Sequence, residues 1–290
     1  MEIVDAHSHF FSRPFFDALA GGDEAKLVAV AQKTGIEIPP RDVATHLARW
    51  IAELDAKGVA HLVTFASLPE EAPAVAEAVE LAGGRLTACA LVNPNVAGSE
   101  EVARNPAFRG VLLFPAMHHF HVAEADAVLQ VADEREALVF VHCGLLVVKL
   151  RDLLGLPRPY DLAYASPLGV IPAANRYPRA KFIIPHFGAG FFRETLMAGT
   201  QCRNIYVDTS STNSWVRTQA QETTLRDVFA RALDVFGPDR ILFGTDSNVF
   251  PAGWRRERFE EQQAVLAELG ASDADQQAIF PGNIRRLLGS

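Results

Sequence analysis

Cysteine is scarce in this chain, which has three cysteines, Cys89, Cys143 and Cys202, among 290 residues. Thiols so few and so widely spaced exclude a disulfide framework and a cysteine-built zinc site, and they favour a reducing compartment. No apolar run approaches the roughly 18 residues that a membrane-spanning helix needs. The first residues also lack the basic and then apolar segments of a secretion signal. We therefore expect a soluble, cytoplasmic protein without a membrane partner.

Positive charge is also in short supply, because 27 Lys and Arg face 35 Asp and Glu for a formal net charge of −8. This balance disfavours a broad surface for nucleic acid, and a small-molecule substrate is the expected partner. With 49% hydrophobic and 21% charged residues the chain is not of the disordered class. A homodimer is the expected oligomer, because dimers are the commonest homo-oligomers of soluble proteins.

Eight short apolar segments, most of them continuous rather than alternating, predict strands buried on both faces of a parallel sheet. The segments between them show helical spacing, as at Val43, Leu47, Ile51 and Leu54. The predicted strands are Ile3–His9, His61–Ala66, Leu86–Asn93, Gly110–Phe114, Leu138–His142, Phe182–His186, Ile205–Thr209 and Ile241–Asp246.

Length alone leaves room for two domains, but a (β/α)₈ barrel takes up about 250 residues or more. Strand followed by helix eight times predicts this TIM barrel as one domain over residues 1–290. An open, doubly wound sheet is the alternative, but no Gly-x-Gly-x-x-Gly follows the first strand. The connections after strands 1 and 5 are extended, and such loops usually build the mouth of a barrel active site.

Polar residues with metal-binding chemistry stand at the ends of four of these strands. In a parallel barrel those ends share one face, and His7 and His9, two residues apart, point the same way. Imidazole nitrogens and a carboxylate suit zinc, with manganese or iron as alternatives. We predict an open ligand set of His7, His9, His142 and Asp246.

His186 is the predicted acid–base residue, because imidazole titrates near neutral pH. A fourth imidazole ligand is its alternative role. Asp246 can combine two roles, ligand and general base, through its two oxygens. A metal lowers the pKa of bound water from about 15.7 toward about 7, so Asp246 could accept the proton while His186 steadies the oxyanion.

Two further carboxylates lie on the same face of the predicted barrel. Asp5 points with the two histidines that follow it, either to orient an imidazole or as a buried structural carboxylate. Asp208, which ends the seventh strand with Thr209 and Ser210, is predicted to give hydrogen-bonding support, with substrate contact as the alternative. His46 and His61 show no sign of a partner.

Substrate contacts are predicted on two loops. His118 and His121 follow the fourth strand, whereas Arg158 and Tyr160 lie in the extended fifth loop. An arginine there can bind a carboxylate through its two-pronged guanidinium. The alternative for all four is an ordinary solvated loop position.

Seven motifs follow one another along nearly the whole chain. They are Asp5-Ala6-His7-Ser8-His9, Phe108-Arg109-Gly110-Val111, Val141-His142-Cys143-Gly144, Ile184-Pro185-His186-Phe187-Gly188, Tyr206-Val207-Asp208-Thr209-Ser210, Phe243-Gly244-Thr245-Asp246 and Gly282-Asn283-Ile284-Arg285-Arg286-Leu287-Leu288. In this order they resemble the amidohydrolase superfamily and within it the amidohydrolase-2 group, which includes aminocarboxymuconate-semialdehyde decarboxylase-like enzymes. The resemblance implies that His7, His9, His142 and Asp246 hold the metal and that His186 is the acid–base group beside it.

The fourth strand departs from the family's two-metal pattern. Many two-metal members carry a bridging lysine there, and some a glutamate, but Gly110-Val111-Leu112-Leu113-Phe114-Pro115 has neither. Arg109 cannot substitute, since it is always cationic. One divalent ion is therefore expected.

The expected function is a metal-dependent hydrolase that attacks a small organic substrate, carboxylated or cyclic, through a metal-activated water. A non-oxidative decarboxylase using the same mononuclear site is the runner-up. A barrel that binds metal or metabolite without turnover is the third reading.

Overall fold

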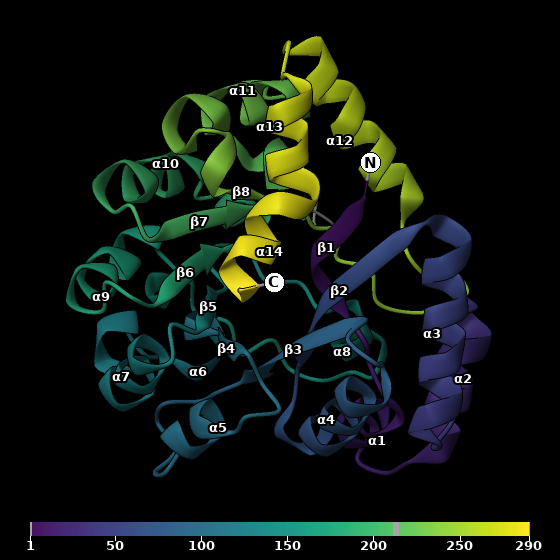
Figure 1. Cartoon of the computed structure of the whole chain (residues 1–290). Helices are drawn as coiled ribbons and strands as arrows, with labels where there is room; N and C mark the ends of the chain where they lie inside the picture. Colours follow the sequence, from purple (N-terminus) through teal and green to yellow (C-terminus); the bar gives the residue numbers. More distant parts are fainter. Residues whose placement is uncertain (1, 211–214, 290) are drawn as a thin grey trace.

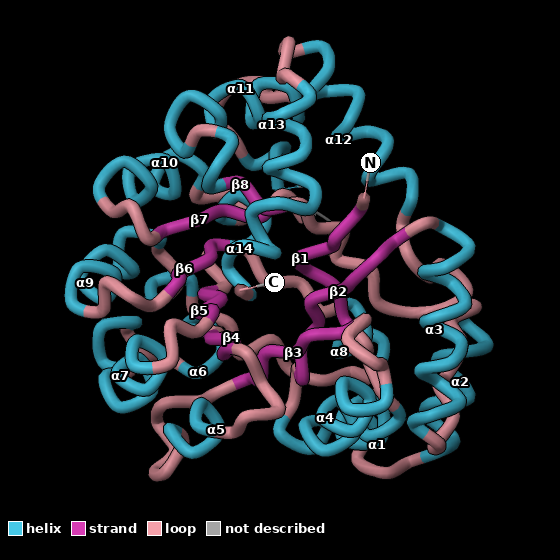
Figure 2. Tube along the Cα trace, in the orientation of Figure 1, coloured by secondary structure: helices cyan, strands magenta, loops and turns pink. Residues whose placement is uncertain are grey.

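The chain forms a barrel of eight parallel strands in sequence order, with helices outside it (Figure 2). The structure is a computed structural model that describes residues 2–210 and 215–289. The strands are β1 (Ile3–His9), β2 (Val59–Ala66), β3 (Leu86–Leu91), β4 (Gly110–Leu113), β5 (Leu138–Val141), β6 (Lys181–Ile184), β7 (Ile205–Asp208) and β8 (Ile241–Leu242).

The predicted TIM barrel is confirmed, and each predicted strand overlaps one in the structure. Six strands, β3 to β8, end one to four residues earlier than expected, and two of these differences bear on the backbone of site residues. β6 stops at Ile184, and a 3₁₀ turn over Pro185–Gly188 follows, in which His186 has φ 57°. β8 spans two residues, and Asp246 beyond it has φ 57°. A left-handed backbone cannot continue a strand, so both side chains project from turns rather than from the sheet.

The barrel closes between β1 and the segment that follows β8. The amide of Ala6 donates to the carbonyl of Phe243 (2.8 Å), and the amide of Asp246 donates to the carbonyl of His7 (2.8 Å). Ser8 and Ser247 add a parallel bridge. β8 itself is too short to pair extensively with β1. The hydrogen bonds between β1 and the residues after β8 therefore set the position of Asp246 relative to β1.

Helices surround the strands, and α3 shows how the sequence sets their bounds. Asp42 caps its first turn by accepting the amide of Thr45 (2.8 Å), and Gly58 ends it at φ 66°. The helices are α1 (Arg13–Ala20), α2 (Glu24–Thr34), α3 (Val43–Lys57), α4 (Ala72–Leu81), α5 (Glu100–Arg104), α6 (Pro115–His118), α7 (Asp126–Glu134), α8 (Lys149–Leu153), α9 (Val170–Arg176), α10 (Phe192–Gln201), α11 (Leu225–Phe236), α12 (Arg256–Glu268), α13 (Asp273–Gln277) and α14 (Asn283–Leu288). None of these helices in the described part of the chain is long and apolar enough to cross a membrane.

The extended connections after β1 and β5 pack against each other. The first carries α1 to α3, and the second carries α8, two short 3₁₀ turns and α9. Phe15, Phe16 and Leu19 of the first share an apolar cluster with Leu150 and Leu154 of the second. Burial of this shared surface joins the two inserts into one wall beside the barrel mouth.

Helix α14 covers the opposite end of the barrel, where it lies across the centre of the strands beside the chain's carboxyl terminus (Figure 1). Its Ile284 and Leu287 belong to the apolar cluster that fills the barrel interior, together with Val4 of β1 and Leu242 of β8. With this end covered, the carboxyl ends of the strands provide the open face of the barrel.

His46 provides a test of the packing between α3 and β1. Its side chain is buried, its Nε2 lies 2.9 Å from the carbonyl oxygen of Phe10, and burial lowers its pKa. Below a pH of about 6.5 the unfolded chain takes up a proton that the folded chain resists, so the free energy of unfolding falls as pH falls. One such group approaches a slope of about 1.4 kcal/mol per pH unit.

We predict that His46→Gln, whose amide can still donate to Phe10, flattens this loss of stability. Urea unfolding of both proteins at about pH 7.5 and about pH 5.5 measures it. His121→Gln, at an exposed position, is the control. Equal losses in wild type and His46→Gln would contradict the prediction.

Candidate metal centre

Three predicted ligands meet at the open end of the barrel. His7 and His9 come from the last part of β1, and Asp246 comes from the turn after β8. Oδ1 of Asp246 lies 3.2 Å from Nε2 of His9 and 3.7 Å from Nε2 of His7. Two ligand atoms that each lie about 2.1 Å from one tetrahedral zinc are about 3.4 Å apart, so these separations fit a shared ion.

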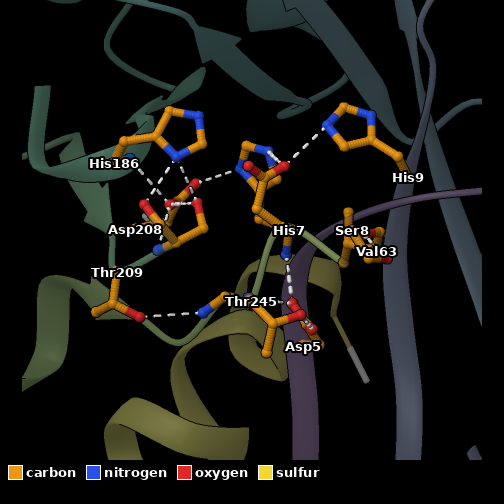
Figure 3. Close-up of polar contacts among 12 residues, drawn as sticks. Asp5, His7, Ser8, His9, Val63, His186, Asp208, Thr209 and Thr245 are labelled. Carbon is orange, nitrogen blue, oxygen red and sulfur yellow. Dashed lines mark hydrogen bonds and ion pairs between the residues drawn. The ribbon is translucent and has the colours of Figure 1, made fainter. Parts of the chain in front are cut away.

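Each of the two histidines is held at its other ring nitrogen. Nδ1 of His7 lies 2.7 Å from Oδ2 of Asp208, and Nδ1 of His9 lies 3.0 Å from Oγ of Ser67. The His7 ring nevertheless remains close to that of His9, with centroids 5.5 Å apart (Figure 3). Both Nε2 atoms are therefore the ones directed at Asp246, an arrangement typical of metal-binding histidines.

Asp208 connects His7 to His186. Its Oδ1 accepts the backbone amide of His186 (3.1 Å) and that of Ser210 (3.0 Å), and it also accepts the Ser210 hydroxyl (Figure 3). Nδ1 of His186 lies 2.7 Å from the carbonyl oxygen of Ser210. Because a carbonyl only accepts, Nδ1 of His186 carries the proton, and in the neutral ring Nε2 has the lone pair.

His142, the fourth predicted ligand, lies near the cluster but outside its tightest part. The groups whose ligand atoms all fall within 4.8 Å of one another are His7, His9 and Asp246, and separately His7, His186 and Asp208. The ring of His142 packs against that of His186, with centroids 5.1 Å apart. Its buried Nδ1 has no hydrogen-bond partner among the described residues.

Electrostatics keep the site ready for a cation. Burial alone would raise the pKa of Asp246, but the hydrogen bond from His9 and the nearby His186 and His7 rings hold it well below its usual range. Burial, reinforced by the neighbouring His186 and His7, lowers the pKa of His142 well below its usual value. The site thus combines an ionised carboxylate with a neutral imidazole.

Among the described residues, Asp5 forms no hydrogen bond to an imidazole ring. Its carboxylate accepts the backbone amide of His7 (2.9 Å), the hydroxyl of Thr245 (2.5 Å) and the indole N–H of Trp254 (2.8 Å). Burial raises its pKa to about 6. Asp5 therefore joins β1 to the segment before Asp246, which matches the structural alternative more closely than the ring-orienting one.

The predicted substrate residues occupy different environments. Arg158 is exposed and pairs with Asp152 (Nε to Oδ1, 2.7 Å), so its guanidinium is engaged on the surface. His121 is exposed, with its ring 4.9 Å from that of Tyr164. By contrast, Nδ1 of His118 and the hydroxyl of Tyr160 are buried without a hydrogen-bond partner among the described residues.

Strand β4 offers the site no anion. Leu112 and Phe114 belong to the cluster that fills the barrel interior, and the Phe114 ring lies 5.2 Å from that of His142. Inward positions that carry a bridging residue in two-metal enzymes are thus apolar here.

Three residues that support the site were not predicted from the sequence to do so. Ser67 directly follows β2, so its strand-end position was an available signal for its contact with His9. Thr245 and Trp254 bind Asp5, and no local pattern marks the tryptophan, which is distant in sequence.

The donor set fits a divalent cation. Asp208 is a buried carboxylate whose pKa is lowered: burial would raise it, but the charge and hydrogen bond of His7 outweigh burial. Because ionised Asp208 can only accept, Nδ1 of His7 must carry the ring proton. Nε2 of His7 then carries a lone pair, and it lies 3.7 Å from the Asp246 carboxylate. Two acceptors facing each other in a buried site need a positive charge between them, either a proton or a metal ion.

A TIM barrel with histidines and an aspartate gathered at its strand ends defines a metal-dependent enzyme class. Residues 4–290 match the model of the amidohydrolase family described as Amidohydro_2, and the chain belongs to that family. This confirms the resemblance seen in the sequence, and with it the prediction of a family enzyme whose members depend on a metal.

Solved structures show the same fold. The 5-carboxyvanillate decarboxylase of Sphingomonas paucimobilis is 13% identical, with a TM-score of 0.64 over 99% of both chains. The probable 2-pyrone-4,6-dicarboxylic acid hydrolase of Acinetobacter baumannii, with citric acid bound, is 16% identical, with a TM-score of 0.62 over 100% of both chains. A zinc-bound amidohydrolase of Burkholderia multivorans is 14% identical, with a TM-score of 0.64 over 100% of this chain and 99% of its own. No curated protein sequence matches the chain significantly.

Replacing Asp208 tests whether it orients His7. We predict that Asp208→Asn weakens zinc binding by about 10- to 100-fold, because the neutral amide loses the charge that fixes the His7 ring. Titration of metal-free protein with zinc measures the affinity, and circular dichroism checks the fold.

Asp126→Asn is the matched control, because that carboxylate pairs with Arg176 on the exposed surface. Zinc affinity equal to wild type in a folded Asp208→Asn protein would rule out the orienting role.

Proposed function

We propose that the protein is a mononuclear metal-dependent hydrolase that acts on a small, cyclic or carboxylated organic substrate. The observation that carries this proposal is the convergence of His7 Nε2 and His9 Nε2 on Asp246 Oδ1. His142, with its buried and unpartnered Nδ1 among the described residues, completes the ligand set that we assign.

Zinc is the ion that we assign, since three imidazoles and one carboxylate match its preferred donors. The zinc bound to the Burkholderia multivorans amidohydrolase supports this choice. One ion per chain follows from the apolar side chains of Leu112 in β4 and Phe114 just after it, which supply no bridging oxygen. When bound, such an ion lowers the pKa of a water ligand from about 15.7 toward about 7.

Asp246 and His186 are the catalytic residues of the proposal. Asp246 is held ionised, so it can accept the proton of the attacking water. His186 donates through Nδ1 to Ser210, which leaves Nε2 to exchange a proton with the substrate. Burial lowers the pKa of His186 and keeps the ring neutral before it reacts.

Aromatic side chains beside His9 support a flat, cyclic substrate. The Phe11 ring stacks on the His9 ring, with centroids 4.7 Å apart and planes 24° apart, and on the Phe15 ring at 4.0 Å. A planar ring is suited to such a wall. We assign polar substrate contacts to His118 and Tyr160, whose buried polar atoms need a partner.

Decarboxylation is the second candidate, and the apolar β4 face favours it as much as single-metal hydrolysis. In that reaction Nε2 of His186 would first take up a proton from water and then deliver it to the carbon atom from which carbon dioxide leaves. The similarity to 5-carboxyvanillate decarboxylase supports this candidate, and that to the pyrone dicarboxylic acid hydrolase supports the first. We also infer a cytoplasmic location from the three buried cysteines, all of them free thiols, and retain the homodimer as a prediction.

Metal content tests the mononuclear assignment. We expect one equivalent of zinc, manganese or iron per chain by elemental analysis, and loss of turnover on chelation with recovery on reloading. Two equivalents would overturn the argument from β4, and full activity without metal would overturn the whole proposal.

Product analysis with wild type and two variants tests the chemistry. A library of aromatic and heterocyclic carboxylic acids and lactones is screened for hydrolytic products and for released carbon dioxide. On the substrate found, we expect Asp246→Asn and His186→Ala to lower kcat by about 100-fold or more.

Released carbon dioxide without hydrolysis would select the decarboxylase. Full turnover in either variant would remove that residue from the mechanism. Tight metal or metabolite binding without turnover on any compound would support a non-catalytic barrel.

A further inference from the structure

Glu71 is a buried carboxylate that the proposed chemistry does not use. It ends the 3₁₀ turn Pro69–Glu71 after β2 and is 0% exposed. Its Oε1 accepts the backbone amide of Ser12 (2.7 Å), and its Oε2 accepts that of Ser67 (2.8 Å). The Ser12 hydroxyl adds a longer bond of 3.3 Å to Oε1.

Both segments that Glu71 joins are connected to His9, one by a hydrogen bond and the other along the chain. Ser67 follows the end of β2 and places its hydroxyl 3.0 Å from Nδ1 of His9. Ser12 lies three residues beyond His9 and is the N-cap of α1. Glu71 therefore fixes both the residue that holds the His9 ring and the chain that leads away from it.

His9 depends on this arrangement more than His7 does. Asp208 binds Nδ1 of His7 with a carboxylate, whereas Nδ1 of His9 meets the neutral hydroxyl of Ser67. A serine side chain has little reach, so the position of that hydroxyl follows the position of the Ser67 backbone. Burying a carboxylate costs free energy unless hydrogen bonds compensate for its lost hydration. Both oxygens of Glu71 accept hydrogen bonds from this one region of the chain.

We propose that Glu71 is a positioning residue for His9. By holding the backbones of Ser67 and Ser12, it keeps Nε2 of His9 directed at Asp246 and thereby sets the affinity for the divalent ion. Glu71 itself touches neither ion nor substrate. This inference rests on the proposed role of His9 as a ligand.

Cobalt binding to metal-free protein tests the proposal, because the visible spectrum of bound Co²⁺ reports ligand geometry as well as affinity. We expect Glu71→Ala and Ser67→Ala each to weaken Co²⁺ binding by about 10- to 100-fold and to change the spectrum. Glu71→Gln should recover part of the affinity, because its amide oxygen can accept one of the two backbone amides. The neighbouring Glu70→Gln is the matched control, because Glu70 is exposed.

A double variant tests the path from Glu71 to His9. If Glu71 acts through Ser67, the loss in Glu71→Ala/Ser67→Ala is smaller than the product of the two single losses. A loss of Co²⁺ affinity in the double variant equal to the product of the two single losses would show that Glu71 does not act through Ser67.

Other outcomes separate this proposal from a merely structural role. A purely structural Glu71 would lower the stability of the metal-free protein and leave the Co²⁺ affinity and spectrum of the folded fraction unchanged, which would overturn the proposal. If Glu71→Ala does not fold, wild-type affinity and spectrum in folded Ser67→Ala would overturn it equally.

The role of Glu71 and the proposed hydrolase function can be refuted separately. Wild-type protein that binds one Co²⁺ but turns over no substrate would refute the hydrolase while the effect of Glu71 on affinity remains measurable. Wild-type protein that binds no divalent ion would refute both.

Discussion

The site depends on the closure of the barrel between β1 and the segment after β8. The amide of Asp246 donates to the carbonyl of His7, and the amide of Ala6 donates to that of Phe243. These bonds place a carboxylate from near the end of the chain beside two histidines from its beginning. Asp5 reinforces the same junction through Thr245 and Trp254, so its buried carboxylate is part of the closure.

Around that junction, each imidazole is oriented by a different partner. Asp208 holds His7 with a charge, Ser67 holds His9 with a hydroxyl, and the Ser210 carbonyl holds His186. These partners engage Nδ1 in every case, which leaves Nε2 for the centre of the site. The consequence is an ionised carboxylate beside several imidazole nitrogens, a donor set that fits a divalent cation and links the fold to metal-dependent chemistry.

Backbone strain accompanies the residues assigned to catalysis. Both His186 and Asp246 have φ 57°, a conformation that non-glycine residues seldom adopt. Both residues lie beyond the ends of their strands, β6 at Ile184 and β8 at Leu242, which the apolar run of each strand did not reveal. Such strain persists where surrounding bonds hold it in place, here the bond from the His186 amide to Asp208 and that from the Asp246 amide to His7.

Local sequence pattern is enough to predict the barrel, the family and the residues at the strand ends, because continuous apolar strands and their polar termini are local features. How those residues are used depends on tertiary contacts. Tertiary contacts place Asp5 at the closure of the barrel and bring Ser67 and Glu71 to His9. The physical reason is that hydrogen-bond partners in a barrel come from neighbouring strands, which are adjacent in space but far apart along the chain.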